Sequence, residues 1–152
     1  MFFLSLADKN APVLRQKAKK ITVFDHNLEQ LVKEMAEIMY KADGVGLAAP
    51  QVGISKCLVV IDVGEGLLPL VNPEIIYTEG EETASEGCLS LPGVFAKVSR
   101  AEKVVVKAQN VRGEEVRIPG SGLLARAMQH EVDHLSGVLF IDKAEPDKDG
   151  KK

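Results

Sequence analysis

The residues best suited to do chemistry are His130-Glu131-Val132-Asp133-His134, near the C-terminal end of the sequence. Residues four apart lie on the same face of an α-helix, so His130 and His134 can bind one metal ion. Glu131 lies beside them and is the candidate general acid and base. The alternative is a pair of surface or capping histidines that bind no metal. The H-E-x-x-H spacing favours a metal-dependent hydrolase.

A catalytic metal site needs a third protein ligand and one position left for water or substrate. In metzincins the motif continues through a glycine to a third histidine, but this chain has Gly137 followed by Phe140, which cannot bind a metal. In thermolysin-like enzymes the third ligand is a later glutamate. The only glutamate after His134 is Glu145, in the polar terminal segment. The third ligand is therefore expected upstream of the motif.

Three upstream residues are credible donors: His26, Cys57 and Cys88. His26 precedes an amphipathic helix, where a polar residue is ordinary, and Cys57 belongs to an apolar strand, where cysteine behaves as a small buried hydrophobe. Cys88 lies in a segment that breaks the strand periodicity, beside Gly87, which allows the backbone to approach an object in the site closely. Cys88 is the preferred third ligand.

The first long helix is predicted over residues 27–42, whose apolar side chains recur at helical spacing. Asn27 and Gln30 could form its capping box, and Gly44 is the expected terminator. The opening residues 1–7 are apolar but lack a basic region before them, so we expect a short first strand there and no signal peptide.

The second helix is predicted over residues 121–135 and carries both histidines, with Ser121 as N-cap and Gly137 just beyond its end. The middle of the chain is rich in β-branched residues and in turn signals. The expected strands there are 57–63, 69–76, 95–100, 104–110 and 114–118, the last two joined as a hairpin through Arg112-Gly113. Strands grouped between two helices, without regular βαβ alternation, predict an α+β domain with a mainly antiparallel sheet.

Length and composition restrict the class of protein further. The chain has 152 residues, 45% of them hydrophobic and 27% charged, with a formal net charge of −3 and a mean hydropathy of +0.02. This composition predicts one folded catalytic domain over residues 1–143, followed by a polar, disordered tail over 144–152. It gives no general attraction to DNA and no apolar run long enough to span a membrane. Because no signal-peptide pattern is present, we expect a reducing compartment, where a disulfide between Cys57 and Cys88 would be unusual.

Three segments together resemble the motifs of peptide deformylase, in that family's order. They are residues 44–51 (GVGLAAPQ), 86–90 (EGCLS) and 129–134 (QHEVDH). The resemblance extends over nearly the whole chain and implies that family's fold, with antiparallel sheets packed around a central metal-binding helix. It also implies removal of formate from N-formylmethionyl peptides. The implied metal is a single divalent ion, iron (Fe²⁺) natively, with Zn²⁺, Ni²⁺ or Co²⁺ as replacements.

The same resemblance implies roles for individual residues. The oxygen that becomes negative in the tetrahedral intermediate would be held by the metal, the Gln51 side chain and the Leu89 backbone N–H. Leu123 and Ala127 lie on the helical stripe that carries the histidines, so we expect them to form the methionine pocket with residues of the first motif. Those residues are Val45 and Gly46.

A salt bridge is also expected beside the metal motif. Asp133 flanks His130 on a helix that is predicted to be buried, where an unpaired carboxylate is costly. Arg100, at the end of a preceding strand, is the expected partner, and the alternative is a solvent-facing carboxylate. Such a pair would fix the metal-binding helix against the sheet.

Three rival readings remain. Gly44, Gly46 and Ala49 with Asp62 also fit a dinucleotide fingerprint, but they follow a helix and run into Pro50 instead of following a strand and opening a helix. A zinc endopeptidase would share the H-E-x-x-H chemistry and would hydrolyse unformylated peptides. An inactive homologue that only binds formylated N-termini would show no turnover when fully loaded with metal.

The expected partners are few. The chain ends soon after Ile141, without the long C-terminal helix by which some bacterial deformylases dock on the ribosome, so only transient proximity to the ribosome is expected. The basic residues Arg15, Lys17, Lys19 and Lys20 more simply form a solvated face. The protein is expected to be a monomer in the bacterial-type cytoplasm or in an organelle stroma or matrix.

Overall fold

The computed structural model describes residues 6–145 and contains two α-helices, three short 3₁₀ helices and seven strands. The helices are α1 (His26–Lys41), α2 (Gly122–Leu135), η1 (Pro12–Arg15), η2 (Ala49–Val52) and η3 (Phe140–Lys143). The strands are β1 (Gly46–Ala48), β2 (Leu58–Ile61), β3 (Leu68–Glu79), β4 (Glu82–Cys88), β5 (Leu91–Arg100), β6 (Lys103–Gln109) and β7 (Glu115–Ser121).

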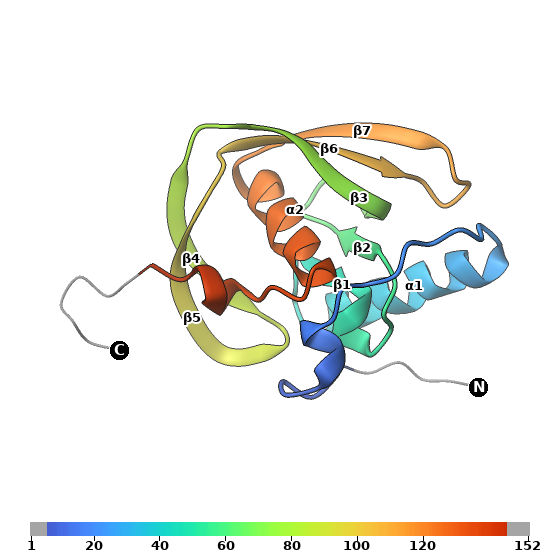
Figure 1. Cartoon of the computed structure of the whole chain (residues 1–152), viewed down its shortest axis with the longest axis horizontal. Coiled ribbons are helices and arrows are strands. Elements are labelled where there is room, and N and C mark those ends of the chain that lie inside the picture. The colour runs from blue at the N-terminus through green and yellow to red at the C-terminus, as the bar shows by residue number, and fades with distance from the viewer. Residues whose placement is uncertain (1–5, 146–152) are drawn as a thin grey trace.

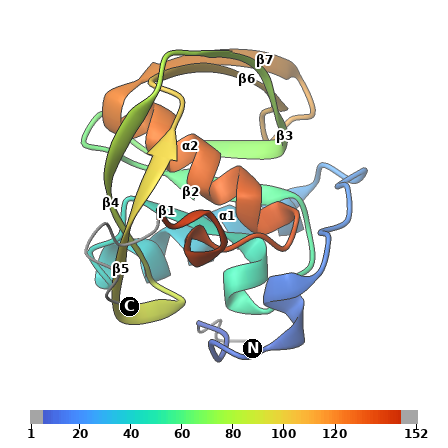
Figure 2. The ribbon, with the colours of Figure 1, turned by 60° about the vertical axis from the view of Figure 1, so that its left-hand side comes forward.

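The strands form two antiparallel sheets around α2. One sheet has five strands in the order β1-β2-β3-β6-β7, and the other pairs β4 with β5. In both views α2 runs through the middle of the molecule, with β3, β6 and β7 along one side and the β4–β5 pair at another (Figures 1 and 2). The predicted α+β class, with antiparallel sheets around a central helix, is confirmed.

The short strand β2 separates two apolar layers. Successive side chains of a strand point to opposite faces of its sheet. Leu58 and Val60 pack in one core cluster with the apolar face of α1, whereas Val59 and Ile61 pack in the other with α2. All four side chains are fully buried. α1 and α2 therefore lie on opposite faces of the sheet at this strand.

The first helix begins one residue earlier than predicted and is capped by a different residue. Asp25 is the N-cap, and its carboxylate accepts hydrogen bonds from the backbone N–H groups of Asn27 and Leu28. The proposed capping box on Asn27 was therefore wrong, because the carboxylate outside the helix satisfies the free N–H groups. At the other end Asp43 has φ +56°, so the residue in left-handed conformation precedes Gly44.

The second helix ends as predicted. The N–H of Gly137 donates to the carbonyl of His134, and the N–H of Val138 donates to that of Asp133. With Gly137 at φ +76°, this is a Schellman motif. At the start, Ser121 is the N-cap by position, but its side chain makes no capping hydrogen bond.

Most predicted strands are present with shifted ends, and the hairpin of β6 and β7 is confirmed. The strands β1 and β4 were not predicted. β4 has the sequence ETASEGC, which contains one β-branched residue, so local propensity does not mark it. Antiparallel pairing with β5 makes this segment a strand despite its low β propensity. Residues 1–5 of the expected first strand lie outside the described residues, and residues 6 and 7 are not in a strand.

The last described residues run along β5. Ala144 forms an antiparallel bridge with Val98, and the N–H of Glu145 donates to the carbonyl of Lys97 at 2.7 Å. Most of the predicted tail, residues 146–152, lies outside the described part of the chain. Over residues 6–145, neither helix has the length and apolar character needed to cross a bilayer.

Candidate metal centre

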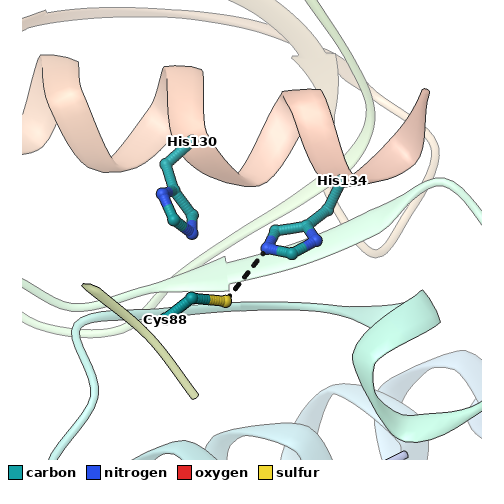
Figure 3. Close-up of side chains that lie close together, drawn as sticks. All are labelled: Cys88, His130 and His134. Carbon is teal, nitrogen blue, oxygen red and sulfur yellow. Dashed lines mark hydrogen bonds between the residues drawn. The ribbon is translucent and has the colours of Figure 1, made fainter. Parts of the chain in front are cut away.

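The structure brings Cys88, His130 and His134 together beside the C-terminal half of α2. One ligand atom from each of the three residues lies within 4.8 Å of the other two. The Cys88 Sγ is 3.4 Å from the His134 Nε2, and the two imidazole rings lie 5.1 Å apart between centroids. Figure 3 shows the two rings leaving α2 on the side that faces the sulfur. The predicted i, i+4 histidine pair therefore meets the preferred cysteine.

Local backbone geometry places the sulfur. Cys88 is the last residue of β4, and the register of the β4–β5 pair shifts between Glu86 and Cys88. Such a bulge re-aims the side chain that follows it. Gly87 allows a close approach, as expected, but its near neighbour is Phe95: a Cβ at Gly87 would lie 2.7 Å from that ring.

The other two candidate donors lie elsewhere. His26 is the first residue of α1, exposed, with its Nδ1 3.9 Å from a carboxylate oxygen of Glu29. The Cys57 thiol donates to the Ala18 carbonyl at 3.4 Å, and burial raises the pKa of that thiol. Both residues have the structural roles that their sequence contexts indicated.

The donor set fits a divalent metal ion. Sulfur and nitrogen donors at about 2.0–2.3 Å from a tetrahedral ion lie about 3.3–3.8 Å from one another, which matches the distance from Cys88 Sγ to His134 Nε2. Burial lowers the pKa of His134 to about 3, which keeps its ring neutral, as metal binding requires. A thiolate with two imidazoles is the donor chemistry of transition metals.

The charges around His130 also suit a cation. Burial lowers the pKa of His130, but the charge of Glu131 and hydrogen bonds with Cys88 and Glu86 raise it to about 10. Groups that stabilise a positive charge on this ring would also stabilise a cation beside it.

Glu131 lies beside the ligands and is almost completely buried. Its Oε2 is 4.0 Å from His130 Nε2, and its Oε1 has no hydrogen-bond partner in the described chain. Burial raises the pKa of Glu131 to about 7. A Cβ on Gly46 would lie 2.6 Å from Glu131 Oε2, so only glycine leaves room for this carboxylate. The carboxyl can thus both accept and return a proton near neutral pH.

The side-chain amide of Gln51 points at the sulfur of Cys88. Its Nε2 donates to Ser90 Oγ at 3.0 Å and to Cys88 Sγ at 3.4 Å. Its Oε1 accepts from the N–H of Ala48 at 2.9 Å, which fixes the orientation of the amide. Leu89 follows Cys88 directly and packs against the α1 layer. Gln51 is 1% exposed, so its donors are held by the fold and shielded from water.

A buried ion-pair network behind the ligands is centred on Glu86. Its two oxygens accept hydrogen bonds from Arg100, Arg126 and His130 Nδ1 at 2.5–2.9 Å. Burial alone would raise the pKa of Glu86, but the hydrogen bonds and charges of His130 and Arg100 lower it to about 2. Because this carboxylate accepts the Nδ1 proton, the Nε2 of His130 is left free to bind a metal.

The expected salt bridge beside the motif is present. Arg100 Nη1 donates to Asp133 Oδ2 at 2.8 Å, and Lys143 Nζ lies 3.0 Å from the same oxygen. Asp133 is thus paired on the helix, and the alternative of a solvent-facing carboxylate was wrong. Gln129 also links α2 to the residue after β5. Its Oε1 accepts from the backbone N–H of Ala101, and its Nε2 donates to the Ala101 carbonyl.

The residues expected to form the methionine pocket differ in exposure. Leu123 is 54% exposed and Val45 is 41% exposed, whereas Ala127 is 5% exposed and packs in the core cluster of α2. Gly46 is buried against Glu131. Two of these residues can therefore meet a ligand without rearrangement, and the pocket stays a prediction.

Comparison with known proteins decides the family. The sequence model of a family described as "Polypeptide deformylase" matches residues 4–150. The chain belongs to the peptide deformylase family. The peptide deformylase of Carboxydothermus hydrogenoformans is 57% identical over 134 residues, covering 88% of each chain. That of Desulfitobacterium hafniense is 52% identical and covers 95% of this chain and 96% of the relative.

Solved peptide deformylase structures have the same fold. The crystal structure from Thermotoga maritima has a TM-score of 0.93 and 48% identity, covering 96% of this chain and all of that one. A structure from Synechococcus elongatus in complex with actinonin has a TM-score of 0.91 and 50% identity, covering 93% and 79%. The expected family and fold are confirmed. The dinucleotide reading fails, because in this deformylase residues 46–48 form a strand that leads into a short 3₁₀ helix.

Sequence reasoning missed two members of the deformylase site, Glu86 and Arg126. Glu86 appeared only as part of the second motif, and Arg126 was not singled out. Both are buried, at 6% and 8% exposure. The available signal was the position of Arg126, four residues before His130, on the face of the helix that must turn inward.

Proposed function

We propose that this chain hydrolyses the formyl amide of N-formylmethionyl peptides, releasing formate, with one divalent metal ion held by Cys88, His130 and His134. The observation that carries the proposal is the meeting of these three donors beside the buried carboxyl of Glu131. The bound ion would act as a Lewis acid and allow hydrolysis at neutral pH. Fe²⁺ is the expected native ion, and Zn²⁺, Ni²⁺ or Co²⁺ are replacements.

Glu131 moves the proton in this proposal. Its Oε1, unpartnered in the described chain, accepts a proton from the attacking water, and the carboxyl then donates that proton to the leaving amine. A pKa raised by burial to about 7 suits both halves of this cycle. Gly46 leaves the space that the carboxylate occupies.

Gln51 and Leu89 stabilise the negative oxygen of the tetrahedral intermediate. The Gln51 amide is oriented by its bond to Ala48 and points Nε2 at the Cys88 sulfur. The backbone N–H of Leu89 supplies the second donor. Donors that are fixed before the reaction need no reorganisation when charge develops.

The substrate methionine occupies a pocket formed by Val45, Gly46, Leu123 and Ala127. The exposure of Leu123 and Val45 supports this assignment, since both can lose water-accessible apolar surface when the side chain enters. An unbranched thioether suits a narrow apolar slot. Ala127 would form its base.

The protein acts as a monomer in a reducing, cytoplasm-type compartment, with transient proximity to the ribosome. The two cysteines of the described chain are free thiols, which supports this setting. Cys88 has to remain reduced to serve as a ligand.

The decisive experiment combines metal analysis with a substrate pair. Protein purified without oxygen is analysed for bound metal and assayed on formyl-Met-Ala-Ser and on unformylated Met-Ala-Ser. We expect one metal ion per chain and release of formate from the first peptide only. Cleavage of the unformylated peptide would favour an endopeptidase, and binding of the formylated peptide without turnover in a fully loaded sample would favour an inactive homologue.

A further inference from the structure

Phe140 lies against a metal ligand, although its side chain cannot bind metal. It is 1% exposed, and its ring lies 5.9 Å from the His130 imidazole between centroids, with 25° between the planes. This is an offset stack within the range of favourable aromatic pairs. The residue that replaces a third histidine in the sequence pattern thus supports one of the two histidines that bind.

The stack supplies a restraint that the Glu86 hydrogen bond cannot. That bond, at 2.9 Å, holds one atom of the His130 ring, Nδ1. A ring held at one atom can still tilt about that contact. A flat apolar surface against the ring face limits the tilt and therefore the direction of Nε2.

Phe140 also packs behind the cysteine ligand. It forms a small core cluster with Leu91, Val98 and Leu139, and Cys88 packs against this cluster. The cluster is separate from the two larger cores on either side of β2. Two of the three proposed ligands therefore pack against Phe140 or the small cluster that contains it.

An ion pair between the two ends of the described chain holds η3 in place. Asp142 Oδ2 accepts from the N–H of Leu139 at 2.9 Å and from Arg15 Nη1 at 2.5 Å. The backbone of Arg15 also packs on Gly137, where a Cβ would lie 2.5 Å from the Arg15 carbonyl oxygen. The segment around η1 thus clamps the turn that joins α2 to η3.

We propose that Phe140 is a positioning residue for His130 and Cys88, and that the Arg15–Asp142 pair keeps it there, so that both set how long the metal stays bound. The inference rests on the proposed metal site. Arg15 was expected to belong to a solvated basic face, and the structure assigns it a partner instead.

The first test uses Phe140→Leu, which keeps an apolar side chain and removes the ring face. Cobalt-loaded protein is mixed with excess chelator, and Co²⁺ release is followed together with the thiolate-to-cobalt absorption band. We expect release to be about tenfold faster, the lower end for loss of a residue that supports a ligand, and a changed band. Leu31→Ala, in the α1 layer, is the control: it lowers the unfolding temperature but leaves release and band unchanged.

The second test uses exposed residues, which do not endanger folding. We expect Arg15→Met and Asp142→Asn each to speed release about twofold to fivefold, the double variant to add little, and Arg15→Lys to restore the rate. Lys103→Met, which breaks the exposed Lys103–Glu79 pair at 3.7 Å, is the matched control. The sign is informative, because loss of the Arg15 charge near His134 would by electrostatics alone slow the release of a cation.

The outcomes separate the two proposals. If the wild-type protein binds no Co²⁺, the metal site fails and this inference fails with it. If the wild-type protein binds Co²⁺ and deformylates, but Phe140→Leu and Arg15→Met release the ion at the wild-type rate or more slowly, only the positioning role is overturned.

Discussion

The two long helices of this deformylase bury different kinds of side chain. α1 has a purely apolar buried face: Leu28, Leu31, Val32, Met35, Ala36 and Met39. The buried residues of α2 include five polar or charged ones: Arg126, Gln129, His130, Glu131 and His134. The helices are of similar length and lie on opposite faces of β2. The two helices therefore differ in the interactions that hold them in place.

Apolar burial holds α1, and it needs no particular partner. A polar group taken out of water needs a partner with matching geometry. For α2 most such partners come from β4, β5 and the residue after β5, through Glu86, Arg100, Cys88 and Ala101 among others. Two buried atoms of α2 have no partner among the described residues: the Nδ1 of His134 and the Oε1 of Glu131, which is the atom proposed to take the proton. We therefore expect the buried face of α1 to contribute to stability alone, and the polar contacts of α2 to serve both stability and chemistry, which the following substitutions test.

Glu131→Gln should have the largest effect on deformylation. The amide keeps the shape of the side chain but cannot accept and return a proton, so kcat should fall by about 10²–10⁴-fold. Metal content and unfolding temperature should stay near those of the wild type. Loss of metal in this variant would mean that Glu131 is a ligand.

Gln51→Ala should have the second-largest effect on deformylation. Loss of one hydrogen-bond donor to the negative oxygen should lower kcat by about 10²–10³-fold. It extends the comparison to η2, which contributes a buried amide that donates to Ser90 and Cys88. Steady-state kinetics on formyl-Met-Ala-Ser, with metal content measured in parallel, gives the result. An unchanged kcat would remove Gln51 from the mechanism.

Glu86→Gln should weaken metal binding by about 10–100-fold and destabilise the fold by about 3–5 kcal/mol, because Arg100 and Arg126 lose their shared carboxylate. The wild-type pKa is about 2 against the usual 4.5. The stability this carboxylate contributes is therefore present above about pH 4.5 and is lost as the pH falls through 2. Between pH 6 and pH 3 the free energy of unfolding should depend less on pH in the variant than in the wild type. Parallel pH profiles for the two proteins would contradict this.

Met35→Ala should have the smallest effect on activity. It removes a fully buried side chain from α1 and should cost about 2–5 kcal/mol of unfolding free energy. Glu37→Gln, on the exposed face of the same helix, is the control and should change stability by less than about 0.5 kcal/mol. Below the unfolding transition both variants should keep wild-type kcat and metal content. A loss of metal from Met35→Ala would break the proposed separation between the helices.

The same contrast explains which predictions held. Periodicity located α1 to within a residue at each end, because its buried face is apolar. Its cap was misassigned, since Asp25 and Asn27 are equally good caps in sequence and only backbone geometry separates them. β4 escaped prediction because its pairing with β5, and not its own residues, makes it a strand.

The sequence by itself determined the chemistry of this protein: the histidine spacing on one helix, the exclusion of every downstream ligand and the three motifs that mark the family. These are local properties, carried by residue type and helical geometry. Only the tertiary structure decided which distant groups would complete the site. The contacts of Glu86 with His130, of Phe140 with the His130 ring and of Arg15 with Asp142 join residues 10 to 127 positions apart. Such contacts depend on how the sheets close around α2, and no local pattern encodes them.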